Sequence, residues 1–186
     1  MATSILWHDS RSGGAEVCIL TSTEETNILR GTIVRPFDGE PAIVRYLVEA
    51  DPTWRTMHVW TELVMAETTR ALELSADGEG HWSSADADLS DLDGCIDIDL
   101  GASPSTNTLP IRRLNLEQRE TRDVRAAWVR YPELTVEVLE QSYERLAADR
   151  YRYRSATFSA ELTVEGNGLV VDYEGVWRAE ARSTSA

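Results

Sequence analysis

Lysine is absent from this 186-residue chain, in which all 18 basic residues are arginine and 32 residues are acidic. Without lysine the chain has neither a Schiff-base nucleophile nor the phosphate-binding lysine of a P-loop, so both kinds of site are excluded. The formal net charge of −14 repels nucleic-acid phosphates and anionic bilayers over most of the surface. We therefore expect no nucleic-acid partner and no electrostatic attachment to membranes.

Long apolar runs are also missing. No segment approaches the roughly 18 apolar residues of a membrane-spanning helix. Residues 1–9 lack the basic and apolar regions of a secretion signal. We therefore expect no integral membrane association and a cytoplasmic location, in which Cys18 and Cys95 stay reduced.

Motifs of catalysis and metal binding are scarce. The three histidines, His8, His58 and His81, are not at the spacing of metal ligands. The chain contains no Gly-x-Ser-x-Gly, no Cys-x-x-Cys and no glycine-rich phosphate loop. We expect no cofactor and no metal, and we favour a binding protein over an enzyme.

Alternation of apolar and polar residues dominates the chain and predicts strands. Over residues 54–63 both faces of the predicted strand are apolar or aromatic. A sheet of this kind needs cover on both sides or a cavity on one. Core packing and ligand stacking both remain open for the aromatic face and for its counterpart at Tyr151 and Tyr153. The two faces are Met57, Val59 and Leu63 on one side, and Trp54, Thr56, His58 and Trp60 on the other.

The region 133–150 fits either a helix or strands. Its apolar residues from Leu134 to Leu146 fit a helical stripe, but residues 134–138 also alternate as a strand, with a hairpin turn over 147–150. We favour strands, because residues 142–152 match a strand region at residues 45–55. Asn167-Gly168 predicts a further hairpin turn.

Short matches occur in the same order in the two halves of the chain. Thr26-Asn27-Ile28-Leu29 returns as Thr106-Asn107-Thr108-Leu109, and each half ends near a tryptophan that follows a glycine, Trp82 and Trp177. We therefore predict an all-β protein, with a minor helix at most, that forms one domain over residues 1–186. Two diverged repeats, approximately 5–82 and 92–178, would form curved antiparallel sheets, half-barrel-like, around an apolar core or cavity.

The acidic strand at residues 93–100 is the best candidate for chemistry. Asp97 and Asp99 share one face, and carboxylates two residues apart on a strand are roughly 7 Å apart. That separation suits the two acids of an inverting glycosidase, or a Ca²⁺ site with further oxygen ligands. Arg112 and Arg113 follow, and they would neutralise these acids from a neighbouring strand. We favour such a structural acid–arginine network, with a site for a ligand headgroup as the second interpretation.

A polar loop at residues 102–108 separates the acids from the arginines. It contains small hydroxyl residues and Asn107. Such loops often hydrogen-bond their own backbone in turns. The alternative is a mouth that binds sugar or ester oxygens.

These segments carry a family resemblance. DLDGCIDIDL (residues 91–100), TNTLPIRRL (106–114) and WVRYP (128–132) resemble a bacterial and archaeal family named for glycolipid binding. The resemblance extends to Tyr173 and implies a curved antiparallel sheet around an apolar cavity, similar to the carriers of lipoproteins in the bacterial periplasm. It implies no catalytic residue. Since we find no signal peptide, we expect a cytoplasmic role in place of a periplasmic shuttle.

We predict a non-catalytic protein that binds an amphipathic small molecule, a lipid or a glycolipid, in a cavity between two sheets. The alternatives are a glycosidase-like hydrolase that uses Asp97 and Asp99, and a protein-interaction module without a small ligand, for example a homodimer formed through an exposed sheet edge. The predicted ligand-binding residues are aromatic wall residues, Trp54, His58, Trp60, Tyr151 and Tyr153, and headgroup residues, Asp97, Asp99, Asn107, Arg112 and Arg113.

Overall fold

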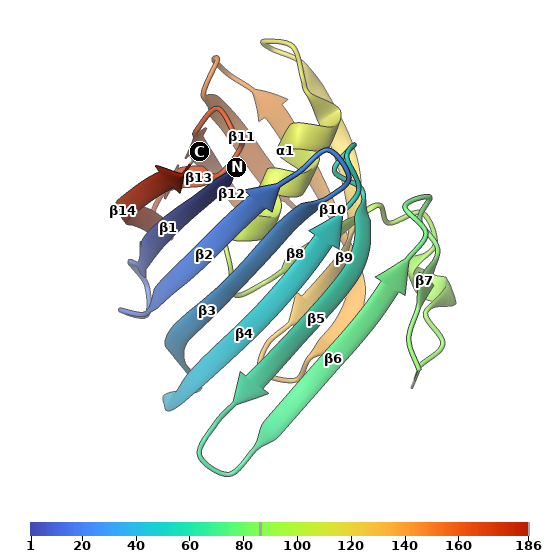
Figure 1. Cartoon of the computed structure of the whole chain (residues 1–186), viewed down its shortest axis with the longest axis vertical. Coiled ribbons are helices and arrows are strands. Elements are labelled where there is room, and N and C mark those ends of the chain that lie inside the picture. The colour runs from blue at the N-terminus through green and yellow to red at the C-terminus, as the bar shows by residue number, and fades with distance from the viewer. Residues whose placement is uncertain (86, 186) are drawn as a thin grey trace.

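The computed structural model describes residues 1–85 and 87–185, which form one curved, open sheet of 14 strands (Figure 1). Strands make up 58% of the protein and helices 7%, so the predicted all-β, half-barrel-like fold is confirmed. The first half contains β1 (Ala2–Asp9), β2 (Ala15–Ser22), β3 (Asn27–Phe37), β4 (Glu40–Ala50), β5 (Thr56–Val64), β6 (Thr69–Ala76) and β7 (Trp82–Ser83). The second half contains β8 (Asp97–Leu100), β9 (Thr121–Arg130), β10 (Thr135–Arg145), β11 (Arg150–Ser155), β12 (Ser159–Val164), β13 (Val170–Tyr173) and β14 (Trp177–Ser185).

The two predicted sheets are therefore continuous, in the order β7-β6-β5-β4-β3-β2-β1-β14-β13-β12-β11-β10-β9-β8. Pairing between β1 and β14 joins the halves. The pairs are antiparallel, as predicted, except that β8 runs parallel to β9. Asn27 begins β3 whereas Asn107 ends a short 3₁₀ helix, so these matched segments differ in structure. The duplication itself stays a prediction.

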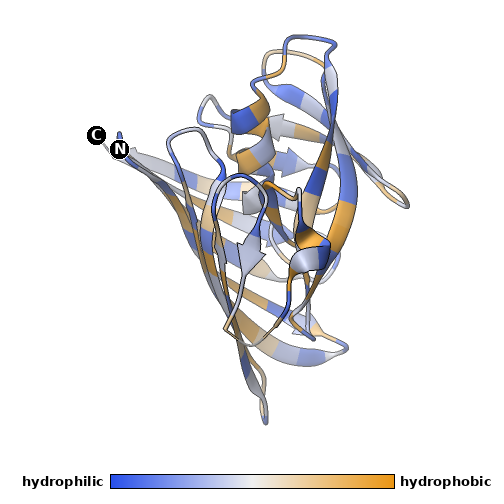
Figure 2. Cartoon of the chain, turned by 90° about the vertical axis from the view of Figure 1, so that its right-hand side faces the viewer, coloured by the Kyte–Doolittle hydropathy of each residue, from blue (hydrophilic) through white to orange (hydrophobic). Residues whose placement is uncertain are grey.

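Hydrophobic and hydrophilic residues alternate along many of the strands (Figure 2), so one set of alternate residues lies on the concave face of the sheet. Leu63, Val44, Ile33, Glu16 and Trp7 are linked from strand to strand by direct pairing. All five are fully buried. Burial of a large aliphatic or aromatic side chain stabilises the fold by about 1.5–3 kcal/mol. Glu16 is the exception in this row, because a buried carboxyl is unfavourable in its charged form.

The free edge at β8 and β9 packs into the concave face of the first half. Tyr131, just after β9, stacks on Phe37 with ring centroids 5.9 Å apart and shares a 2.8 Å hydrogen bond with Thr61. The backbone N–H of Ile98 donates to the Thr56 hydroxyl at 3.1 Å. In Figure 1, β8 and β9 accordingly lie behind β3 to β5. The curved sheet therefore folds back on itself, and the side chains between its two halves form a packed core.

The predicted faces of residues 54–63 are right from His58 to Leu63 and wrong for the residues before His58. Glu49 pairs with His58 and Ala50 pairs with Thr56, so Met57 is the extra residue of a β-bulge. After this bulge Val59 and Leu63 face the core, while His58 and Trp60 lie on the outer face, half-buried; Thr56 is buried and Trp54 precedes the strand.

Residues 108–114 form a helix where the sequence analysis placed a strand. The 3₁₀ helices η1 (Ser90–Leu92) and η2 (Ser105–Asn107) and the helix α1 (Thr108–Leu114) complete the described elements. Pro110 lies in the first turn of α1, where a proline is tolerated, and Asn115 ends the helix with a left-handed φ of 42°. Ile111 packs with Tyr143 and Leu162 of the concave face. The helix therefore fills part of the space inside the second half.

The region 133–150 consists of strands, as favoured, because β10 and β11 pair across a turn at residues 146–149. Within the described ranges, no helix is long and apolar enough to cross a membrane.

Candidate functional site

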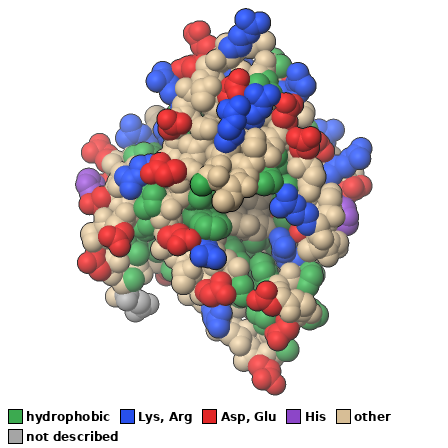
Figure 3. Space-filling view, turned by 180° about the vertical axis from the view of Figure 1, so that it is seen from behind, with side chains coloured by type: hydrophobic (Ala, Val, Ile, Leu, Met, Phe, Trp, Pro, Cys, Tyr) green, Lys and Arg blue, Asp and Glu red, His purple; other side chains and the backbone are tan. Residues whose placement is uncertain are grey.

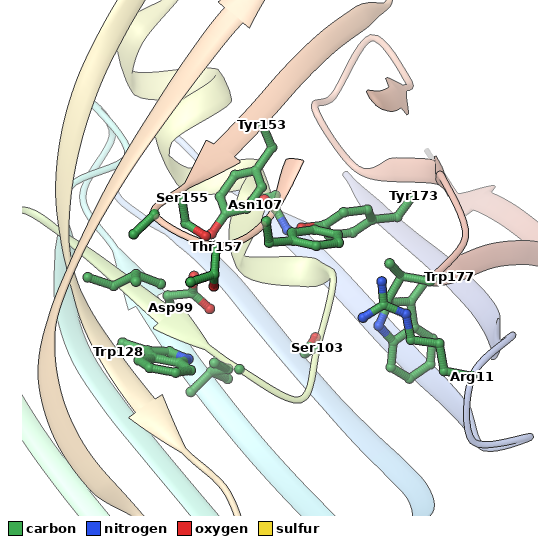
Figure 4. Close-up of a pocket in the computed structure, with 16 residues that line it drawn as sticks. Arg11, Asp99, Ser103, Asn107, Trp128, Tyr153, Ser155, Thr157, Tyr173 and Trp177 are labelled. Atoms are coloured by element: carbon green, nitrogen blue, oxygen red, sulfur yellow. The ribbon is translucent and has the colours of Figure 1, made fainter. Parts of the chain in front are cut away.

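A pocket of about 350 Å³ lies on the concave face of the second half (Figure 4). Asp99 and Trp128 are direct neighbours on β8 and β9 and form one end of it. Tyr153 of β11, Tyr173 of β13 and Trp177 of β14 supply further aromatic walls. Seen from behind, the surface of the molecule has a hollow with hydrophobic side chains in it and with acidic and basic residues around it (Figure 3).

Asp99 is half-buried, and its carboxylate accepts a hydrogen bond from the side-chain amide of Gln141. Burial raises the pKa of Asp99 to about 6, and the hydrogen bond from Gln141 partly offsets this rise. Asp99 is therefore a carboxylate at neutral pH, with acceptor capacity left for a ligand. Hydrogen bonds to charged groups are stronger than those between neutral groups, so a hydroxyl that donates to Asp99 would be held firmly.

Asn107 is fixed on the wall between the strands and α1. Its side-chain oxygen accepts from the Tyr143 hydroxyl at 2.8 Å, and its amide nitrogen donates to the carbonyl of Pro104 at 3.1 Å. Because both ends of the amide are engaged, Asn107 acts mainly in shaping the pocket. The predicted polar mouth at residues 102–108 is mostly buried, so its residues turn inward.

Ser103 connects the pocket wall to the fully buried Glu16. The Ser103 hydroxyl donates to Oε1 of Glu16 at 2.7 Å, and the Tyr46 hydroxyl donates to the same oxygen at 2.5 Å. Burial raises the pKa of Glu16 to about 8, against the lowering effect of these two hydrogen bonds. Oε2 of Glu16 has no hydrogen-bond partner within the described ranges. Glu16 is thus mainly a neutral acid near pH 7, and it anchors the loop that follows β8.

Gly101 allows the Trp128 ring to lie against this loop. A Cβ atom at position 101 would lie 2.5 Å from Nε1 of Trp128 and 3.1 Å from the carbonyl oxygen of Val129. The Arg130 guanidinium lies 5.2 Å from the centre of the Trp128 ring. A glycine is therefore needed for the observed position of the indole.

Arg11 lies at the opposite end of the pocket from Asp99, beside Trp177 (Figure 4). It belongs to the turn between β1 and β2, which Asp9 holds by accepting from the backbone N–H groups of Arg11 at 2.8 Å and Ser12 at 3.2 Å. The Arg11 side chain lies 5.1 Å over the ring of Phe158, and its Nε donates to the carbonyl of Gly175 at 3.2 Å. These contacts orient the guanidinium towards the pocket.

The structure brings only some of the predicted residues together. Asp99, Asn107 and Tyr153 line the pocket. Tyr151 is buried and, with Arg112, lines a separate small cavity of about 90 Å³.

The other predicted headgroup residues are engaged elsewhere. Arg113 binds Asp97 through two hydrogen bonds of 3.0 and 2.5 Å, as the acid–arginine network predicts, but it does so from α1. Arg112 is engaged away from Asp97 and Asp99. It donates a hydrogen bond to the carbonyl of Gly166 at 3.0 Å, and its guanidinium lies 5.3 Å from the centre of the Trp54 ring. Trp54 is buried in the core.

The pocket does not contain the paired acids of a glycosidase. Asp97 is 1% exposed, is bound by Arg113, and does not line the pocket, so Asp99 is the one acid among the described lining residues. Nor do three His, Cys, Asp or Glu side chains gather as metal ligands anywhere in residues 1–85 and 87–185.

Sequence reasoning missed most of the aromatic walls. The missed residues include Arg11, Trp128, Phe158, Tyr173 and Trp177, whereas Ser103 belongs to the polar loop that was predicted as an alternative mouth. The sequence analysis used Trp177 only as the end of a repeat. Trp128 lies beside Asp99 because β8 and β9 pair in parallel, and no local sequence pattern predicts this pairing.

Comparisons with known proteins give one family and one similar solved structure. The family model described as "Putative glycolipid-binding" matches residues 4–179. A crystal structure of a DUF1089 family protein from Pseudomonas aeruginosa is 33% identical, with a TM-score of 0.81, over 89% of this chain and 91% of that chain. A search of curated proteins gives no significant match.

Proposed function

Because this chain belongs to the glycolipid-binding family, we propose that it binds a glycolipid or a similar amphipathic molecule without transforming it. The sugar would lie in the pocket between Asp99 and Trp177. The observation that supports this most is the combination of aromatic rings with a carboxylate that has spare acceptor capacity. Sugars present C–H faces that pack on aromatic rings and hydroxyls that donate to carboxylates.

The size of the pocket favours a headgroup over a whole lipid. Small-molecule sites usually measure about 300–1,000 Å³, and this pocket, at about 350 Å³, is at the lower end. The interior between the two halves of the sheet is filled by residues such as Trp7 and Tyr46. The proposal therefore places the sugar in the pocket and lets the lipid chain leave through its mouth.

Binding of octyl glucoside, below the concentration at which it forms micelles, tests this proposal. Isothermal titration calorimetry should give saturable binding that is weakened by Trp128→Ala and by Asp99→Asn. Trp60→Ala is the matched control, because Trp60 lies on the outer face. Absence of binding, or equal losses in Trp60→Ala and Trp128→Ala, would count against a sugar in this pocket.

A further inference from the structure

The two ends of the pocket differ in charge, with Asp99 at one end, Arg11 at the other, and aromatic rings between them (Figure 4). We propose that the ligand's sugar carries an anionic group, which Arg11 binds while the sugar hydroxyls donate to Asp99. This inference rests on the proposed function and narrows it to acidic glycosides.

Arg11 has the features of an anion-binding residue. It forms no ion pair within the described ranges, and the nearby Asp9 is engaged by Arg35 at 3.1 Å and by the N–H groups of its own turn. Nε of Arg11 is used by Gly175, so the two terminal nitrogens carry the remaining donors. A guanidinium in this state binds a carboxylate or a phosphate through two parallel hydrogen bonds.

Asp99 determines the orientation of the ligand. It forms no ion pair within residues 1–85 and 87–185, and its one described hydrogen bond comes from neutral Gln141, whereas the adjacent acid Asp97 is neutralised by Arg113. An uncompensated carboxylate repels an anion placed beside it and accepts from hydroxyls. The anionic group is therefore directed towards Arg11.

The rings between these ends favour a sugar as the connecting body. Tyr153, Tyr173 and Trp177 line the pocket between the acid and the arginine. Since burial raises the pKa values of the Tyr153 and Tyr173 hydroxyls, both stay neutral and add no charge of their own. A ring with hydroxyls at one edge and an acid group at the other matches this order of contacts.

Three probes with the same octyl chain separate the possibilities: octyl glucoside, octyl glucuronide and octyl phosphate. By calorimetry, the glucuronide should bind at least about tenfold more tightly than the glucoside, since hydrogen bonds between charged groups are stronger than those between neutral groups. Octyl phosphate, which lacks a sugar, should bind more weakly than the glucuronide. Arg11→Gln should abolish the preference for the glucuronide over the glucoside.

Two further variants serve as controls. Arg178→Gln removes the same charge from an exposed residue next to Trp177 that does not line the pocket, and it should keep the preference. Arg11→Lys should retain part of it, because lysine keeps the charge without the two-pronged geometry.

Each contrary outcome has a distinct meaning. Equal binding of glucoside and glucuronide, or equal effects of Arg11→Gln and Arg178→Gln, overturns the inference and leaves the proposed function standing. If octyl phosphate binds as tightly as octyl glucuronide, the ligand needs no sugar, and the inference is overturned as well. If neither glycoside binds, the inference and the proposed function both fall.

Discussion

Replacing Glu16 with glutamine should remove a large part of the pH dependence of stability between about pH 4.5 and about pH 8. These limits are the ordinary pKa of a glutamate and the pKa of buried Glu16. Glutamine keeps the side-chain oxygen that accepts from Tyr46 and Ser103, but it cannot ionise. The variant therefore isolates the effect of a charge in the core.

The direction in which stability changes with pH follows from proton binding to Glu16. The folded protein holds the Glu16 proton more tightly than the unfolded chain, so the associated stability is fully present below about pH 4.5 and is lost progressively up to about pH 8. A rise in pKa from 4.5 to about 8 corresponds to a total loss on the order of 5 kcal/mol. The difference in free energy of unfolding between Glu16→Gln and the wild type should therefore change by an amount of this order between pH 4.5 and about pH 8.

Urea denaturation at a series of pH values measures this difference. Glu25→Gln, in the exposed turn before β3, is the matched control and should give a curve parallel to that of the wild type. If the curves of Glu16→Gln and the wild type are also parallel, Glu16 ionises without penalty and the reasoning about its burial is wrong.

Three more substitutions test other parts of the structure. Arg113→Ala leaves Asp97 buried without its cation and should destabilise the protein by about 3–5 kcal/mol in urea denaturation. Arg112→Ala should have a smaller effect, because Arg112 forms no ion pair with any described residue; equal effects would contradict the assignment of the pair. Gly101→Ala should displace Trp128 and weaken binding of octyl glucoside in calorimetry, and unchanged affinity would refute the role of that contact. Leu63→Ala should lower the free energy of unfolding by about 2–5 kcal/mol, because Leu63 is fully buried in the core; a loss below about 1 kcal/mol would show a looser core.

Local patterns predicted the strands well. Over residues 133–150 the apolar pattern left a helix and strands open, and the match of residues 142–152 with residues 45–55 favoured the strands that the structure has. The pairing of Asp97 with an arginine was also predicted, because Arg112 and Arg113 follow it closely in the sequence and a buried carboxylate needs a cation or hydrogen bonds.

Long-range geometry was beyond such patterns. The bulge at Met57 places Thr56 on the core side of β5, and its cause is the register with β4, which a single strand does not encode. The short helix over 108–114 contains a proline and has few turns, so tertiary packing on the concave face decides its form. Pairing of β8 with β9 then creates the pocket from residues that are far apart in the sequence.

The most direct test of a sugar in this pocket is an NMR titration that follows the indole N–H signals of the six tryptophans, each assigned by substitution with phenylalanine. On addition of octyl glucuronide, the signals of Trp128 and Trp177 should shift together and saturate, while that of Trp60 stays in place. Shifts largest at Trp60, or absent from Trp128 and Trp177, would contradict binding on the concave face.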